Sequence, residues 1–181
     1  MGKFKEKTLK KRRIYKGRIV SLREDTVKLS TGRVAKREIV EHKGAVAIIA
    51  ICGKDKIVLV KQFRKPADRV LYEIPAGLAN KGESDPAAAK RELEEETGFL
   101  AGRVKKVFEG YSSPGYSTEV IKFFVATNLK KTKQRSDDDE LIDVMVIPIR
   151  SCSSLIKKGM IKDNKTLIGI MLAQKAIKKK A

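Results

Sequence analysis

The chain has 181 residues and a formal net charge of +19, with 41 Lys and Arg residues against 22 Asp and Glu residues. This length fits one domain with a small appendage and allows a sizeable core. Two cysteines and a single histidine exclude a disulfide framework and a histidine-based metal cluster. We expect a cytoplasmic protein with no membrane span, because the lysine-rich N-terminus has no hydrophobic signal region and the longest apolar run is Ala45 to Cys52.

The positive charge gathers at the two ends of the chain. Residues 3–18 hold nine Lys or Arg residues against Glu6 alone, and further lysines close the sequence. Such a field attracts polyanions and predicts weak, nonspecific nucleic-acid binding. The alternatives are that it steers a polyanionic substrate or only keeps the protein soluble, and both stay open.

The first expected element is a small antiparallel β-meander within residues 1–42. Its strands are predicted at residues 13–22, 25–30 and 33–42, with turns at Glu24-Asp25 and Thr31-Gly32. These strands are only half apolar, so the sheet must pack on the main domain or on a second subunit.

Residues 43–181 are expected to form the main domain. Strands are predicted at 45–52, 56–63, 70–77, around 103–109, at 119–127 and at 141–149, and helices are predicted at 85–97, 152–159 and about 164–179. Strands before and after a helix predict an α/β fold, in which a mixed β-sheet is sandwiched between α-helices.

Two of these helices carry specific signals. Asp85 is expected at the N-cap of the first, with Pro86 at its first helical position, and Gly98 is placed to end it. In the last helix we expect a buried stripe formed by Leu167, Ile168, Ile170, Met171 and Ile177.

The first of these helices also concentrates acidic side chains. Glu92, Glu95 and Glu96 stand at i, i+3 and i+4, so their carboxylates share one face. Like charges this close repel unless a cation lies among them, and Mg²⁺ prefers oxygen ligands. Arg91 is placed to orient a carboxylate with two hydrogen bonds. The pattern therefore predicts a metal site that binds and cleaves a diphosphate.

The segment from Gly77 to Phe99 follows the pattern G-x5-E-x7-R-E-U-x-E-E-x-G-U, where U is aliphatic or aromatic. The positions are met by Gly77, Glu83, Arg91, Glu92, Leu93, Glu95, Glu96, Gly98 and Phe99. Given average residue usage, seven such identities agree by chance at on the order of 10⁻⁸ per starting position. The chain resembles the Nudix hydrolases, which implies the Nudix fold and hydrolysis of a diphosphate.

The resemblance implies a role for each residue of the acidic set. The implied metal ligands are Glu92, Glu95, Glu96 and the backbone carbonyl of Ala76, holding two or three Mg²⁺ ions that Mn²⁺ can replace. The implied catalytic group comprises Glu95, Glu96, Arg91 and Glu140. Glu140 belongs to the acidic loop at 137–140 and is favoured as the general base, with Asp138 as the alternative.

A second motif bears on the substrate. Pro114 lies sixteen residues beyond Gly98, which resembles the ADP-ribose pyrophosphatase subgroup and implies AMP and ribose 5-phosphate as products. The implied substrate-binding residues are Arg37 and Glu38 at the adenine, Arg64 at the phosphate or terminal ribose, Gly115 and Tyr116 at the ribose, and Glu73. The alternatives are an ordinary turn at Pro114 and plain surface charges at Arg37 and Arg64.

Members of this subgroup exchange the N-terminal meander between two subunits, which implies a homodimer. The alternative substrates are another nucleoside diphosphate sugar, such as GDP-mannose, or a capped RNA end. A further alternative is a catalytically silent module that binds ADP-ribose as a regulator.

Overall fold

The computed structural model describes residues 2–135 and 141–178 and divides the chain into two compact units. The N-terminal unit contains the chain up to Gly44 together with Tyr111–Val120. The second unit contains Ala45–Gly110 and the chain from Ile121 onward.

The N-terminal unit is an antiparallel sheet of β1 (Lys7–Lys16), β2 (Val20–Lys28) and β3 (Val34–His42), in that order. The meander is confirmed, but its first turn was predicted in the wrong place. The chain turns at Gly17, whose N–H donates to the Val20 carbonyl over 2.9 Å. Glu24 and Asp25 lie in the middle of β2, where Arg12 and Arg23 pair with them at 3.2 and 3.0 Å. Arg12 of β1 and Arg23 of β2 itself stabilise these acids within a strand, so they do not mark a turn.

The loop at 111–120 packs along the end of β3 within the same unit. The Val40 N–H donates to the Tyr116 carbonyl over 2.8 Å, and the Thr118 N–H donates back to the Val40 carbonyl over 3.0 Å. The Thr118 hydroxyl accepts a further hydrogen bond from the His42 N–H over 3.0 Å. These bonds fix the position of the loop relative to β3.

The second unit is built on a seven-stranded mixed sheet. Its main path runs β10 (Ile142–Pro148), β5 (Lys56–Arg64), β4 (Ala45–Cys52), β9 (Val120–Lys131) and β8 (Phe99–Tyr111), while β6 (Arg69–Glu73) pairs with β5 and β7 (Ala76–Gly77) with β4. β4 and β9 are parallel, whereas β4 runs antiparallel to β5 and β7.

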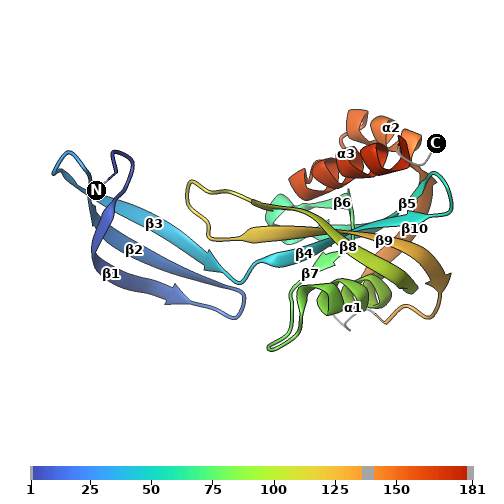
Figure 1. Cartoon of the computed structure of the whole chain (residues 1–181), viewed down its shortest axis with the longest axis horizontal. Helices are drawn as coiled ribbons and strands as arrows, with labels where there is room; N and C mark the ends of the chain where they lie inside the picture. The colour runs from blue at the N-terminus through green and yellow to red at the C-terminus, as the bar shows by residue number, and fades with distance from the viewer. Residues whose placement is uncertain (1, 136–140, 179–181) are drawn as a thin grey trace. The chain divides into compact units, whose positions relative to one another are not determined.

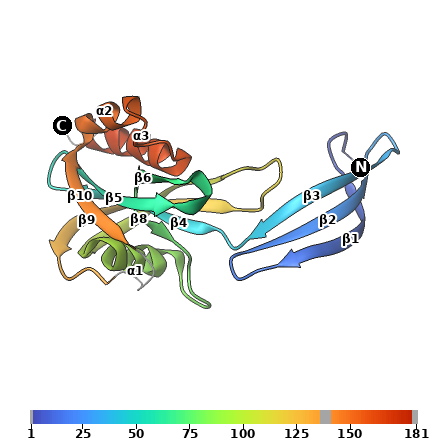
Figure 2. The ribbon, with the colours of Figure 1, turned by 180° about the vertical axis from the view of Figure 1, so that it is seen from behind.

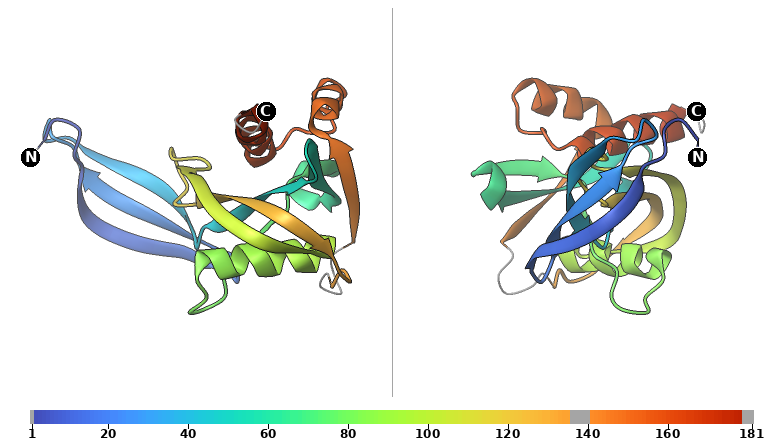
Figure 3. Two further views of the ribbon diagram at one scale, coloured as in Figure 1. Left: turned by 45° about the vertical axis from the view of Figure 1, so that its right-hand side comes forward. Right: turned by 90° about the vertical axis from the view of Figure 1, so that its left-hand side faces the viewer.

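Helices cover both faces of this sheet (Figures 1 and 2). α1 (Asp85–Thr97) lies on one face, and α2 (Cys152–Lys157) and α3 (Asn164–Lys178) lie on the other, as Figure 3 also shows. Side chains of β4 alternate between the two cores: Ile48 packs with Leu93 of α1, and Ile49 packs with Ile170 of α3. The predicted mixed sheet between helices is confirmed.

The stripe predicted on α3 is partly wrong. Leu167, Ile168 and Ile170 pack in the core, but Met171 is 69% exposed. The buried side of the helix continues from Ile170 to Ala173, which are one turn apart, so Met171 points away from the sheet. The side chain of Ile177 lies outside the described residues. In the part of the chain that is described, no helix is long and apolar enough to cross a membrane.

Candidate active site

The acidic helix α1 begins and ends sharply because of the residues at its ends. Ser84 is the N-cap, so the predicted cap at Asp85 is wrong by one residue, and Pro86 lies in the first turn. The Asp85 carboxylate instead accepts hydrogen bonds from Lys122 of β9 at 2.7 and 2.9 Å. Gly98 adopts a left-handed conformation with φ of 66° and its N–H donates to the Glu94 carbonyl, as expected for the end of the helix.

Arg91 gathers the carboxylates of the motif. Its guanidinium donates to Glu83 at 2.9 and 3.0 Å, to Glu92 at 2.8 Å and to Glu95 at 2.7 Å. It also donates to the Leu78 carbonyl over 2.8 Å. Hydrogen bonding to Glu83 is the largest of the effects that raise the pKa of Arg91, and the same bond lowers the pKa of Glu83. Arg91 therefore fixes the loop before α1 and two carboxylates on the helix face.

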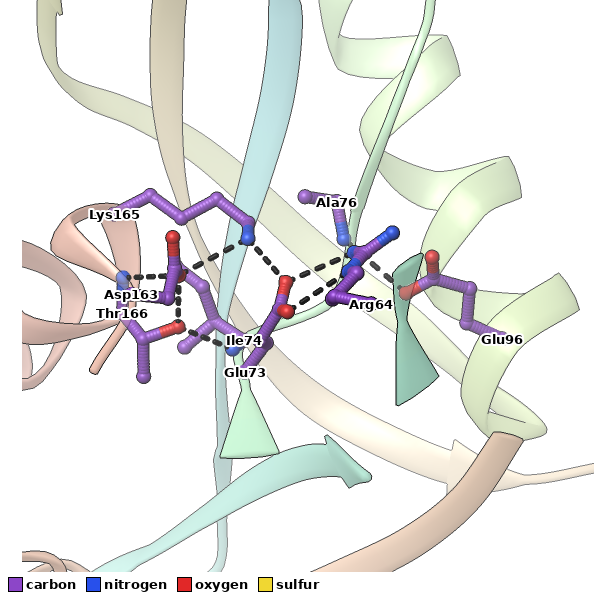
Figure 4. Close-up of polar contacts among 8 residues, drawn as sticks. All are labelled: Arg64, Glu73, Ile74, Ala76, Glu96, Asp163, Lys165 and Thr166. Atoms are coloured by element: carbon purple, nitrogen blue, oxygen red, sulfur yellow. Dashed lines mark hydrogen bonds and ion pairs between the residues drawn. The ribbon is translucent and has the colours of Figure 1, made fainter. Parts of the chain in front are cut away.

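The short strand β7 lies against the other side of these acids. A Cβ added to Gly77 would overlap the Glu92 carboxylate, so only glycine lets that carboxylate lie on the backbone there. The Ala76 N–H donates to Glu96 Oε2 over 3.1 Å, and Glu96 is 5% exposed. Figure 4 shows this bond between β7 and α1. The Ala76 N–H thus holds Glu96, and the Glu92 carboxylate lies against the backbone of Gly77.

The oxygen atoms gathered here are the type of ligand that a hard divalent cation prefers. Glu92, Glu95 and Glu96 supply carboxylate oxygens on one helix face, and the Ala76 backbone lies beside them through its N–H bond to Glu96. Among the described residues, no three acidic, His or Cys side chains already stand together as a formed metal site. Glu92 and Glu95 share the Arg91 guanidinium instead, so a cation already neutralises the repulsion between them.

A second charged group lies beside α1. Glu73, at the end of β6, is 2% exposed and accepts two hydrogen bonds from Arg64, each of 2.8 Å. Lys165 of α3 forms an ion pair with the same carboxylate. Burial alone would raise the pKa of Glu73, but the hydrogen bonds and charges of Arg64 and Lys165 outweigh it and lower this pKa to about 2. Glu73 is therefore an anion at neutral pH, held between two cations.

The remaining predicted substrate residues belong to the N-terminal unit. Arg37 donates to the Glu6 carboxylate at 2.5 and 3.1 Å, which raises the pKa of Arg37. Glu38, Gly115 and Tyr116 are exposed, and the Tyr116 backbone is bonded to β3. The structure thus places Arg37 and Glu38 on β3, and Gly115 and Tyr116 on the loop that is bonded to it.

Residues 41–167 match the NUDIX domain. This chain belongs to the NUDIX family. Residues 6–40 match the nucleoside diphosphate sugar hydrolase N-terminal domain. The family predicted from the motif is therefore confirmed, and with it the assignment of the chain as a Nudix hydrolase.

Relatives and a solved structure align with nearly the whole NUDIX chain. ADP-ribose pyrophosphatase of Bacillus subtilis is 40% identical over 96% of this chain and 95% of its own length. Methanol dehydrogenase activator of Bacillus methanolicus is 43% identical over 96% of both chains. A crystal structure of an ADP compounds hydrolase has a TM-score of 0.87 at 21% identity, covering 98% of this chain and 96% of that one, which supports the fold.

One predicted residue of the NUDIX site is not described by the structure, and one charged contact of the site was not predicted. Glu140 and its alternative Asp138 lie outside the described residues, so the general base stays a prediction. Lys165 was missed, because its contact with Glu73 joins residues 92 positions apart. The only local signal was Asp163 ahead of an apolar helical run, a pattern that predicts a helix start without identifying its partner.

Proposed function

We propose that this NUDIX protein hydrolyses the diphosphate of ADP-ribose to AMP and ribose 5-phosphate and depends on Mg²⁺. The observation that carries the reaction is the set of carboxylates on α1 that Arg91, Ala76 and Gly77 hold at β7. The substrate rests on the relative named ADP-ribose pyrophosphatase, which aligns with 96% of the chain.

In this proposal the acidic set would hold the metal. Glu92, Glu95, Glu96 and the Ala76 carbonyl are the ligands, for two or three Mg²⁺ ions that Mn²⁺ can replace. Mg²⁺ held there would supply positive charge opposite the diphosphate and would lower the pKa of a bound water. Arg91 keeps Glu92 and Glu95 in position, because its planar guanidinium bonds both carboxylates at once.

The other residues would bind and orient the substrate. Arg64, held by Glu73, presents a cation to a phosphate or to the terminal ribose. Arg37 stacks on the adenine, since guanidinium planes pack well on flat rings. Glu38 accepts a hydrogen bond from the adenine. Gly115 and Tyr116 line the ribose. Glu140 takes the proton from water, with Asp138 as the alternative.

A substrate panel tests the proposal. Purified protein is incubated with ADP-ribose, ADP-glucose, GDP-mannose or capped RNA, with Mg²⁺ and separately with EDTA, and release of mononucleotide is measured. We expect ADP-ribose to be cleaved fastest, and only with the metal. Glu96→Gln should abolish this activity, and the control Glu94→Gln on the same helix should keep it. A preference for GDP-mannose or capped RNA would reject the substrate, and binding without turnover would identify a regulator.

A second candidate function comes from the relative named methanol dehydrogenase activator, which is 43% identical to this chain. In that case the chain would raise the rate of a partner dehydrogenase. The test adds wild-type protein or Glu96→Gln to the Bacillus methanolicus dehydrogenase and follows alcohol oxidation. No change in rate with the wild type would reject this candidate.

We also propose a homodimer that exchanges the N-terminal meander. Leu9, Ile14, Tyr15 and Val34 of that unit are exposed, and apolar side chains on a small sheet favour burial against another chain. Light scattering at working concentration should give twice the chain mass, and a monomer mass would refute the dimer. The cytoplasmic location and the weak nucleic-acid binding stay predictions.

A further inference from the structure

The first turn of α3 contains a lysine that no step of the proposed reaction uses. Lys165 forms an ion pair with Glu73 and a second one, of 3.0 Å, with Asp163. Its side chain is only 13% exposed. A mostly buried lysine in the first turn of a helix is electrostatically unfavourable, because the helix dipole is positive at that end. Its contact with Glu73 offsets this effect.

The backbone around Lys165 is tied to the chain next to Glu73. Asp163 accepts hydrogen bonds from the Thr166 N–H at 2.9 Å and from the Thr166 hydroxyl at 2.6 Å. The same hydroxyl accepts a bond from the Ile74 N–H over 2.9 Å, and Ile74 follows Glu73 directly. Figure 4 shows these bonds as one connected network. Lys165 is therefore held at a fixed place beside the Glu73 carboxylate.

Glu73 in turn sets the direction of Arg64. Two parallel bonds, from Nε and Nη2 and each of 2.8 Å, fix the guanidinium plane. The hydrogen bond with Glu73 raises the pKa of Arg64, burial opposes this, and the charges of Glu73 and Glu96 add to the rise. The guanidinium thus lies within electrostatic reach of the acidic set on α1, while its side chain remains 37% exposed.

We propose that Lys165 is a positioning residue, which locks the Glu73 carboxylate so that Arg64 points its other N–H groups at the substrate diphosphate or terminal ribose. Lys165 itself does not touch the substrate. Without it, Glu73 keeps one cation and gains freedom to rotate, and Arg64 loses its fixed direction. This inference rests on the proposed function, since it assigns the target of Arg64.

A double-mutant cycle separates positioning from a merely structural ion pair. Lys165→Met and Arg64→Met are made singly and together, with the exposed Lys162→Met as the charge-matched control. Lys165→Arg tests rescue, and Lys165→Gln replaces Lys165→Met if that variant fails to fold. The readouts are KM and kcat for ADP-ribose with Mg²⁺, and Kd for ADP-ribose in EDTA by calorimetry.

We expect Lys165→Met to raise both KM and Kd about tenfold, with a smaller change in kcat. A tenfold rise in Kd equals a loss of about 1.4 kcal/mol of binding free energy. In the Arg64→Met background the same substitution should change Kd by less than about twofold, because its effect passes through Arg64. Lys165→Arg should recover most of the affinity, and Lys162→Met should match wild type.

Two results would overturn the inference: an unchanged Kd in Lys165→Met, or an equal loss with and without Arg64. These two results differ from those expected if the proposed function is wrong. In that case wild-type protein would neither cleave nor bind ADP-ribose in the same measurements. If wild type binds ADP-ribose without cleaving it, the Kd cycle alone decides between positioning and structural roles.

Discussion

Glu73→Gln tests how strongly the buried carboxylate stabilises the folded chain. The substitution keeps the shape of the side chain and removes the charge that Arg64 and Lys165 share. Both cations then stay beside a neutral group in a place where Glu73 was 2% exposed. Removing one partner of a buried ion pair is destabilising, because the remaining charge has lost both water and its counter-ion.

The pKa of Glu73 gives the expected loss of unfolding free energy in Glu73→Gln. Burial raises this pKa, but Arg64 and Lys165 lower it from 4.5 to about 2. At about 1.4 kcal/mol per pKa unit, the shift corresponds to about 3 kcal/mol of unfolding free energy. Because the folded-state pKa is the lower one, this contribution is present above pH 4.5 and is lost as the pH falls from 4.5 towards 2.

Urea unfolding at about pH 7 and about pH 3 measures both effects. The matched control is Glu109→Gln, since Glu109 is 54% exposed in its pair with Lys106, and such surface pairs contribute less than about 1 kcal/mol. We expect Glu73→Gln to lose about 3 kcal/mol near neutral pH and clearly less in acid. The reasoning is refuted if both variants are equally stable at neutral pH, or if the loss in Glu73→Gln does not shrink in acid.

Three further outcomes are expected. Glu96→Gln should lower kcat for ADP-ribose by at least about 10³-fold through loss of a charged ligand, and near-normal turnover in a steady-state assay would reject the site. Gly77→Ala should lower kcat about 10-fold to 100-fold with an unchanged circular dichroism spectrum, because its Cβ would displace the Glu92 carboxylate; full activity would show that this placement is unimportant. Burial raises the pKa of the Cys152 thiol to about 11, so a Cys52→Ser variant should react with a disulfide reagent only after unfolding, and prompt reaction when folded would contradict this.

The geometry of α1 could be predicted because local rules decide it. Gly98 ends the helix, and the spacing of Glu92, Glu95 and Glu96 puts them on one face whatever surrounds the helix. Arg91 was expected to bond a carboxylate and does so. Only the predicted helix start was wrong: Ser84 is the N-cap, and the Asp85 carboxylate accepts a hydrogen bond from Lys122 of a distant strand.

Contacts between distant residues could not be predicted in this way. Asp25 is a common turn residue, yet Glu24 and Asp25 lie inside β2, where Arg12 of β1 and Arg23 of β2 pair with them. The pairing of Arg37 with Glu6 joins residues 31 positions apart. Lys165 meets Glu73 only because α3 packs beside β6, which no local pattern at either residue reveals.

The central claim is that water attacks a phosphorus of ADP-ribose at this site. Its most direct test is hydrolysis in water enriched in oxygen-18, with Mg²⁺, followed by mass spectrometry of the products. We predict AMP and ribose 5-phosphate in equal amounts, with one labelled oxygen in the phosphate of one of them. Release of ADP and ribose, or products with no label in either phosphate, would contradict the claim.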